Sequence, residues 1–174
     1  MSEAYVYSGS DKLSIESVNA AAAATFVVYP DGNLTDEEAQ KYINESGIKD
    51  IVDRAASKVY VARPANGISF TDDDVIGFET IVGKIGVSNN FKLIGIGDGA
   101  TFINQNLTSY MNFVSGLALI NPAQGQEVKV SVPTYLVTDD QAVINSYVKA
   151  NNAGKVKDGY YENPESHYAV SYTH

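Results

Sequence analysis

Short apolar runs alternate with amphipathic segments along most of this chain. The apolar runs have the length of strands and are bounded by proline, glycine, asparagine and aspartate, which is typical of buried β-strands. They cover residues 24–29, 58–62, 91–96, 115–120 and 132–137. Segments with helical periodicity begin near residues 35, 71, 100 and 140. Continuously apolar strands separated by helices predict a mostly parallel sheet with helices on both faces.

Two of the helix starts carry explicit N-terminal signals. Thr35-Asp-Glu-Glu38 is a capping box, and the helix that it opens is expected to stop at Gly47. A second, shorter segment of this kind runs over residues 48–57. Thr71-Asp-Asp-Asp74 places acidic residues in a first helical turn, where the helix dipole favours them. This acidic run lacks the spaced oxygen ligands of a calcium loop, so the helix start explains it without a cation.

The last twenty residues differ from the rest of the chain. Residues 155–174 are rich in tyrosine and polar side chains, lack a helical period, and predict an edge strand or a tail. Their tyrosines could stack on a ligand, but packing at a sheet edge is the simpler interpretation; they are Tyr160, Tyr161, Tyr168 and Tyr172. No repeat or linker interrupts residues 1–174, so we expect a single α/β domain, which could be a fragment of a longer chain.

The amino-acid composition excludes several classes of function. The 174 residues are 44% hydrophobic and 19% charged, which is typical of one globular domain with a real core. The formal charge of −9, without a basic cluster, disfavours nucleic-acid binding. The absence of cysteine excludes thiolate catalysis and cysteine-based metal centres, and two histidines are few for a metal site. We therefore expect neither a metal nor a cofactor.

No targeting or membrane segment is evident from the pattern. Residues 1–10 lack the basic start and long apolar run of a signal peptide. Residues 20–29 are apolar but too few to cross a bilayer. We expect a soluble protein without a membrane span, either cytoplasmic or the trimmed form of an exported protein, and the sequence leaves its oligomeric state open.

The glycine-rich stretch Leu93-Ile-Gly-Ile-Gly-Asp-Gly-Ala-Thr-Phe102 leads from a predicted strand into a predicted helix. It resembles the nucleophile elbow of α/β-hydrolases, G-x-S-x-G, with Gly95 and Gly99 at the flanking positions and Gly97 where the family has serine. The order of strands and helices over residues 24–152 is also similar to that family, most closely to polyhydroxybutyrate-depolymerase and feruloyl-esterase-like proteins. The resemblance implies an α/β-hydrolase-like three-layer sandwich and an esterase-like hydrolase.

The resemblance also implies roles for particular residues. In the family's order of nucleophile, acid and base, Asp140 fits the acid, and Asp139 is the alternative. His167 fits the base, and His174 is the other choice.

The resemblance further implies an oxyanion hole. It would use the Asp98 N–H and a second N–H near Gly32 or Asn33. Gly97, however, has no side chain with which to form an acyl-enzyme. Asp98 is a poor substitute, because shifting the elbow by one residue would put Ile96 where a small residue is needed.

Two functions remain open at this point. The first is a relative of carboxylic ester hydrolases that acts on a small-molecule ester or apolar ligand but lacks the serine nucleophile. The second is a non-catalytic binding or structural domain on the same fold.

The glycines of the turn also match a dinucleotide-binding turn, G-x-G-x-x-A, at Gly95, Gly97 and Ala100. That motif expects an acidic residue after the next strand, where this chain has Asn121-Pro122, and Asp98 would repel a pyrophosphate.

Overall fold

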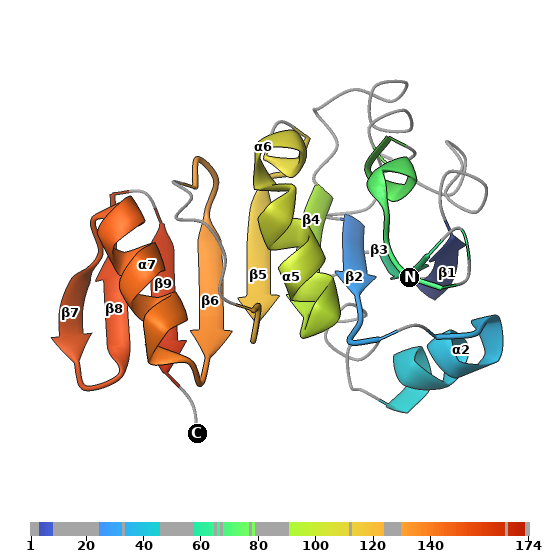
Figure 1. The fold of residues 1–174 in the computed structure, drawn as a ribbon, viewed down its shortest axis with the longest axis horizontal. Coiled ribbons are helices and arrows are strands. Elements are labelled where there is room, and N and C mark those ends of the chain that lie inside the picture. Colours follow the sequence, from blue (N-terminus) through green and yellow to red (C-terminus); the bar gives the residue numbers. More distant parts are fainter. Residues whose placement is uncertain are drawn as a thin grey trace.

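A computed structural model describes residues 4–8, 25–32, 34–45, 58–64, 66, 68–76, 78, 91–111, 113–123, 130–165 and 167–172. Within these ranges nine strands form one sheet, in the order β1-β3-β2-β4-β5-β6-β9-β8-β7 (Figure 1). Their bounds are β1 Ala4–Ser8, β2 Thr25–Tyr29, β3 Lys58–Arg63, β4 Phe91–Ile96, β5 Gly116–Ile120, β6 Thr134–Thr138, β7 Gly154–Lys157, β8 Tyr160–Asn163 and β9 Tyr168–Tyr172. The predicted strands β2 to β6 are confirmed within two residues at each end.

The predicted helices that begin near residues 35, 71, 100 and 140 are present in the described ranges, with one interruption, whereas the segment predicted over 48–57 and the stop predicted at Gly47 lie outside the described residues. Their bounds are α2 Asp36–Glu45, α5 Asp98–Gln105, α6 Leu107–Tyr110 and α7 Gln141–Asn151, and residues 72–76 are also helical. The helix expected over 100–112 is divided at Asn106, whose side-chain Nδ2 donates to Phe102 O at 2.9 Å. The capping box is confirmed: Thr35 N donates to Glu38 Oε2 at 3.1 Å, and Glu38 N donates to Thr35 Oγ1 at 3.2 Å.

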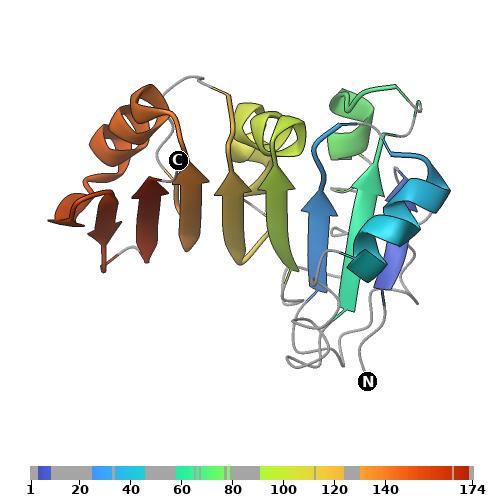
Figure 2. The same ribbon diagram turned by 90° about the horizontal axis from the view of Figure 1, so that it is seen from below.

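More of the described helices lie on one face of the sheet than on the other (Figure 2). Helices α5 and α7 cover the face that carries the main core, whose largest fully buried side chains include Tyr29, Leu93, Ile103 and Leu119. On the opposite face, α2 covers a smaller core over β2 and β3, formed by Val28, Ala39 and Val61. The alternation of side chains along β2 and β3 therefore contributes residues to two separate cores.

The predicted fold class, an α/β-hydrolase-like three-layer sandwich with a mostly parallel sheet and helices on both faces, is wrong for this chain. The sheet is mixed, because β8 runs antiparallel to both β7 and β9 and makes one edge antiparallel. On the second face the described residues place only α2, at the β1-β3-β2 end (Figure 2). The physical cause of the antiparallel edge is the Asp158-Gly159 turn, where Gly159 has φ +75° and reverses the chain between β7 and β8.

The segment 155–174, expected to be an edge strand or a tail, contributes to three strands. β7 is the edge strand, but β9 lies inside the sheet, parallel to β6 and antiparallel to β8. Tyr168 is buried, and Tyr161 and Tyr172 pack against the main core, so these tyrosines serve sheet packing. The amino-terminal strand β1 was not predicted; it pairs in parallel with β3.

Candidate functional site

The turn between β4 and α5 has the sharp geometry that its glycines suggest. Gly97 has φ 55° and ψ −117°, a conformation that L side chains rarely adopt. Its N–H donates to Ile120 O at 2.8 Å, and its carbonyl accepts from Thr101 N at 3.0 Å. The backbone at residue 97 is thus fixed from the neighbouring strand β5 and from the first turn of α5.

The two flanking glycines are needed because chain segments approach each other closely. A Cβ at Gly95 would lie 2.6 Å from Ala100 Cα, and a Cβ at Gly99 would lie 2.1 Å from Tyr29 O. Both distances are far shorter than any ordinary contact, so strand β4, helix α5 and the end of β2 meet here only without side chains. This close packing brings the end of β2 against the first turn of α5.

Asp31, immediately after β2, occupies the space beside Gly97. A Cβ built on Gly97 would lie 2.3 Å from Asp31 Oδ1. The same Oδ1 accepts a hydrogen bond from Asp98 N at 3.0 Å. Asp31 therefore satisfies the first amide of α5, since Gly97 has no side chain with which to cap the helix.

A carboxylate of the chain itself therefore occupies the expected oxyanion hole. The Asp98 N–H that was to stabilise an oxyanion already donates to a carboxylate of the chain itself. Gly32 has φ +83° and lies at the rim of a cavity. Asn33, the other candidate, lies outside the described residues.

The cavity beside this turn has a volume of about 250 Å³. It opens between the ends of β2 and β3 and helix α5, and it is lined by Gly32, Pro64, Ile68, Ser69, Phe70, Asp98, Thr101, Phe102 and Gln105. Ile68 at its rim is 75% exposed, which is high for a large apolar side chain. Apolar walls with a few polar groups are typical of small-molecule sites.

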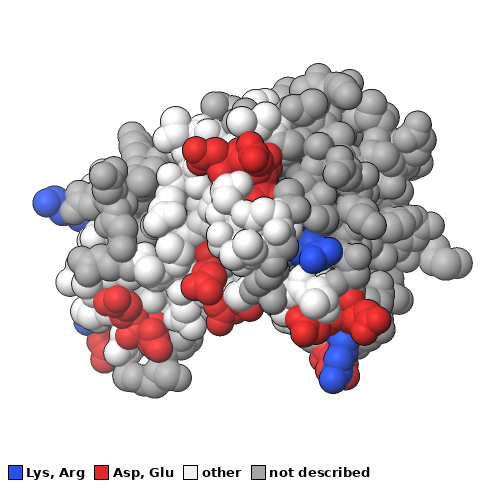
Figure 3. Space-filling view, turned by 45° about the vertical axis from the view of Figure 1, so that its right-hand side comes forward, with Lys and Arg blue, Asp and Glu red and all other residues white. Residues whose placement is uncertain are grey.

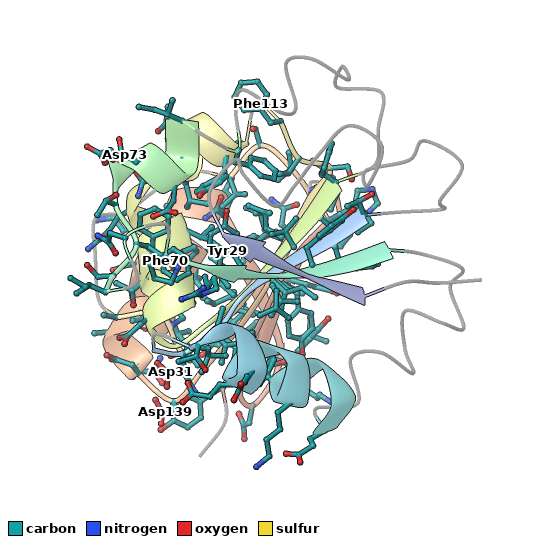
Figure 4. The ribbon with its side chains drawn as sticks, turned by 90° about the vertical axis from the view of Figure 1, so that its right-hand side faces the viewer. Tyr29, Asp31, Phe70, Asp73, Phe113 and Asp139 are labelled. Carbon is teal, nitrogen blue, oxygen red and sulfur yellow. The ribbon has the colours of Figure 1, made fainter. Side chains whose placement is uncertain are left out.

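An aromatic cluster forms the floor of this cavity. The rings of Phe70 and Phe102 stack at 5.2 Å, and the buried Tyr29 ring packs 5.1 Å from Phe70 (Figure 4). The Tyr110 hydroxyl donates to the Tyr29 hydroxyl at 3.0 Å. Burial, reinforced by Tyr110 and Asp74, raises the pKa of Tyr29 well above its ordinary value. Tyr29 is therefore a neutral structural support rather than an acid or base.

The two aspartates after β6 serve local structure. Asp140 Oδ1 accepts from Ala142 N at 2.9 Å, so Asp140 is the N-cap of α7. Asp139 N donates to Asn121 Oδ1 at 3.1 Å, while its side chain is exposed. Asp140 thus caps the helix that follows β6.

His167 lies at the opposite end of the strands from Gly97 and Asp140. It precedes β9, and its carbonyl accepts from Thr134 N at 3.0 Å, at the start of β6. Asp140 follows the end of β6, so the length of the strand, about 13 Å at 3.3 Å per residue, separates the two residues. The structure does not bring the predicted base to the predicted acid, and the alternative His174 lies outside the described residues.

Two further interpretations of the sequence are tested by the contacts. The acidic run at Thr71 is a helix start, since Thr71 N donates to Asp74 Oδ2 at 2.9 Å. Among the described residues no group of histidine, cysteine, aspartate and glutamate is suited to hold a metal ion. A dinucleotide would need the amides at the start of α5, but Asp31 already occupies the first of them.

Sequence reasoning missed two contributors to this site, Asp31 and Phe70. Asp31 stands in a Pro-Asp-Gly turn, a pattern that signals only a change of direction.

Comparison with protein-family models and with curated proteins gives no match. Of the helices that the structure describes, none is long and apolar enough to span a membrane.

Proposed function

We propose that this chain is a non-catalytic protein that binds a small molecule in the cavity beside the turn at Gly97. The observation that carries the proposal is the position of the Asp31 carboxylate. It takes the space of a nucleophilic side chain and also the amide hydrogen that would stabilise an oxyanion. A site with both positions filled favours binding over acyl transfer.

The arrangement of the other groups supports the same conclusion. Asp140 caps α7, and His167 is separated from it by the length of β6. General base catalysis requires a base within hydrogen-bond reach of the group that it deprotonates. No described histidine meets that requirement at Gly97 or Asp98, whereas the aromatic cavity beside the turn remains open.

The cavity volume is suited to a ligand of about the size of one substituted ring. A cavity of roughly 150 Å³ is enough to bind benzene, and this one measures about 250 Å³. The stacked Phe70 and Phe102 rings offer a flat apolar surface, and Ser69, Thr101 and Gln105 supply polar groups around it. These features favour a small ligand with an apolar ring or chain.

The proposal is tested by titrating the isotope-labelled chain with 2-phenylethanol and following backbone amide shifts by NMR. We expect saturable shifts centred on residues 98–105 of α5. Ser69→Trp, which fills the cavity from an exposed position, should abolish them. Ser131 is exposed before the start of β6, at the opposite end of the strands from the cavity. Ser131→Trp should therefore leave the amide shifts unchanged.

A p-nitrophenyl acetate assay on the same sample tests the absence of catalysis. We expect hydrolysis no faster than in buffer. Either a lack of saturable shifts at α5, or hydrolysis that disappears in Asp98→Asn, would overturn the proposed function.

A further inference from the structure

We infer that the ligand of this cavity is a small amphipathic cation, with an apolar ring or chain and an ammonium-type head. This inference rests on the proposed function, because it names the ligand class for the same cavity. The two halves of such a ligand correspond to two parts of the cavity wall, an aromatic floor and an acidic rim.

The aromatic floor supplies surfaces that suit both the apolar body and the charge. Phe70 and Phe102 line the cavity with their rings 5.2 Å apart and only 24° from parallel. A cation within about 6 Å of a phenyl ring is attracted by its electron-rich face. We therefore expect the floor to attract an ammonium group as well as an apolar ring.

The rim carries two carboxylates, those of Asp98 and Asp31. Asp98 lines the cavity, and Asp31 is joined to the Asp98 backbone at 3.0 Å. Neither carboxylate forms an ion pair with a described lysine or arginine, and no basic residue appears among the described residues that line the cavity. Arg63 precedes the lining residue Pro64 in the chain and directs its Nε to Leu34 O, to which it donates at 3.1 Å.

The wider charge distribution has the same sign. The formal charge of the chain is −9, and among the described residues on the face drawn in Figure 3 there are several groups of acidic side chains and few basic ones. Such a field attracts cations and repels anions during encounter. It adds to the local effect of Asp98 and Asp31.

The usual means of binding an anion at this place is already occupied. The amino terminus of a helix attracts carboxylates and phosphates through its free amides. In this chain the first amide of α5 donates to Asp31, which also neutralises the positive end of the helix. An anionic ligand would have to displace Asp31 and approach Asp98, so we expect anions to be rejected.

Three probes of one shape separate these possibilities: 2-phenylethylammonium, 2-phenylethanol and phenylacetate. We expect the ammonium to bind at least about tenfold more tightly than the alcohol, equivalent to about 1.4 kcal/mol. Phenylacetate should bind most weakly. High salt should reduce the advantage of the ammonium, because the rim charges are exposed.

Matched variants identify the source of the preference. Asp98→Asn should lower ammonium affinity to that of the alcohol while leaving alcohol affinity unchanged. Asp139→Asn makes the same change of net charge away from the cavity and should preserve the preference. The inference is overturned if the alcohol binds as tightly as the ammonium, or if phenylacetate binds more tightly than either. If none of the three probes binds, the proposed function itself fails.

Discussion

The Asp31 carboxylate and the backbone of Gly97 share one small space, in which no side chain at position 97 fits. The would-be Cβ of residue 97 lies 2.3 Å from Asp31 Oδ1 and 2.9 Å from Asp31 Cβ. Placing serine here requires Asp31 to rotate away and to release the Asp98 amide. Gly97 and Asp31 are therefore energetically coupled.

This coupling predicts the outcome of a double-mutant cycle. Gly97→Ser should destabilise the chain, because it adds both a strained φ and a clash with Asp31. The loss should be smaller in an Asp31→Ala background, with a coupling of about 1 kcal/mol. Urea unfolding of the four proteins measures it. A parallel cycle with Gly154→Ser, where the new Cβ would meet nothing within 4 Å, should show no coupling.

Gly99 makes the closest approach in the turn, and its substitution should be costly. Gly99→Ala would place a Cβ 2.1 Å from the Tyr29 carbonyl oxygen, which belongs to rigid backbone. We expect a loss of about 3 kcal/mol in the free energy of unfolding, at the upper end for overpacking. Gly154→Ala is the control and should change stability by less than about 0.5 kcal/mol. Equal effects in chemical denaturation would contradict the close packing.

Asp140 and Asp139 offer a matched test of capping. Asp140→Ala removes the acceptor for Ala142 N and should cost about 1 kcal/mol. Asp139→Ala removes an exposed side chain of the same charge and should stay within about 0.5 kcal/mol of the parent. Thermal unfolding distinguishes them. If Asp139→Ala were the more damaging substitution, the capping role assigned to Asp140 would be wrong.

Two buried tyrosines on α7 and β9 should respond in opposite ways to loss of the hydroxyl. The Tyr147 hydroxyl donates to the buried Asn104 side chain, so Tyr147→Phe should cost about 1–3 kcal/mol by leaving an amide unpaired. The buried Tyr168 hydroxyl forms no hydrogen bond of ordinary geometry with the described residues, so Tyr168→Phe should be neutral or stabilising. Urea midpoints of the two variants provide the comparison. A larger loss for Tyr168→Phe would indicate a partner for its hydroxyl.

Alkaline pH should weaken the fold through these same rings. Burial raises the pKa of Tyr29, Tyr147 and Tyr168 above the ordinary value of 10.0. Below that value both folded and unfolded states hold the phenol protons, and stability is unaffected. Above it the unfolded chain releases protons that the folded chain retains, so stability must fall as pH rises. Phenolate absorbance should show a late-titrating group of tyrosines that merges with the others in urea.

Much of the sheet was predictable because apolar runs, turn residues and capping boxes act locally. The Thr35 and Thr71 helix starts follow directly from neighbouring residues, as do strands β2 to β6. The antiparallel edge depended on a turn at Asp158-Gly159 that signals a hairpin only when its flanking strands are also identified. The short polar strands β7 and β8 lack the apolar pattern that would have identified them.

The site was predictable only in part. The glycine pattern identified the turn at Gly97 and its close packing, since only glycine satisfies those backbone positions. The contact between Asp31 and Asp98 joins residues 67 positions apart, and no local pattern encodes it. His167 was placed by its order in the chain, but order does not determine which end of a strand a residue occupies. That depends on where β9 enters the sheet.

The strand order also constrains how the chain assembles during synthesis. Among the described strands, the hairpin of β7 and β8 is hydrogen-bonded to the rest of the sheet through β9, which follows both strands in the chain. During synthesis, the edge of β6 that pairs with β9 therefore has no partner strand until residues 168–172 have left the ribosome. A nascent chain that stops before β9 therefore leaves β6 as an open sheet edge, which favours aggregation.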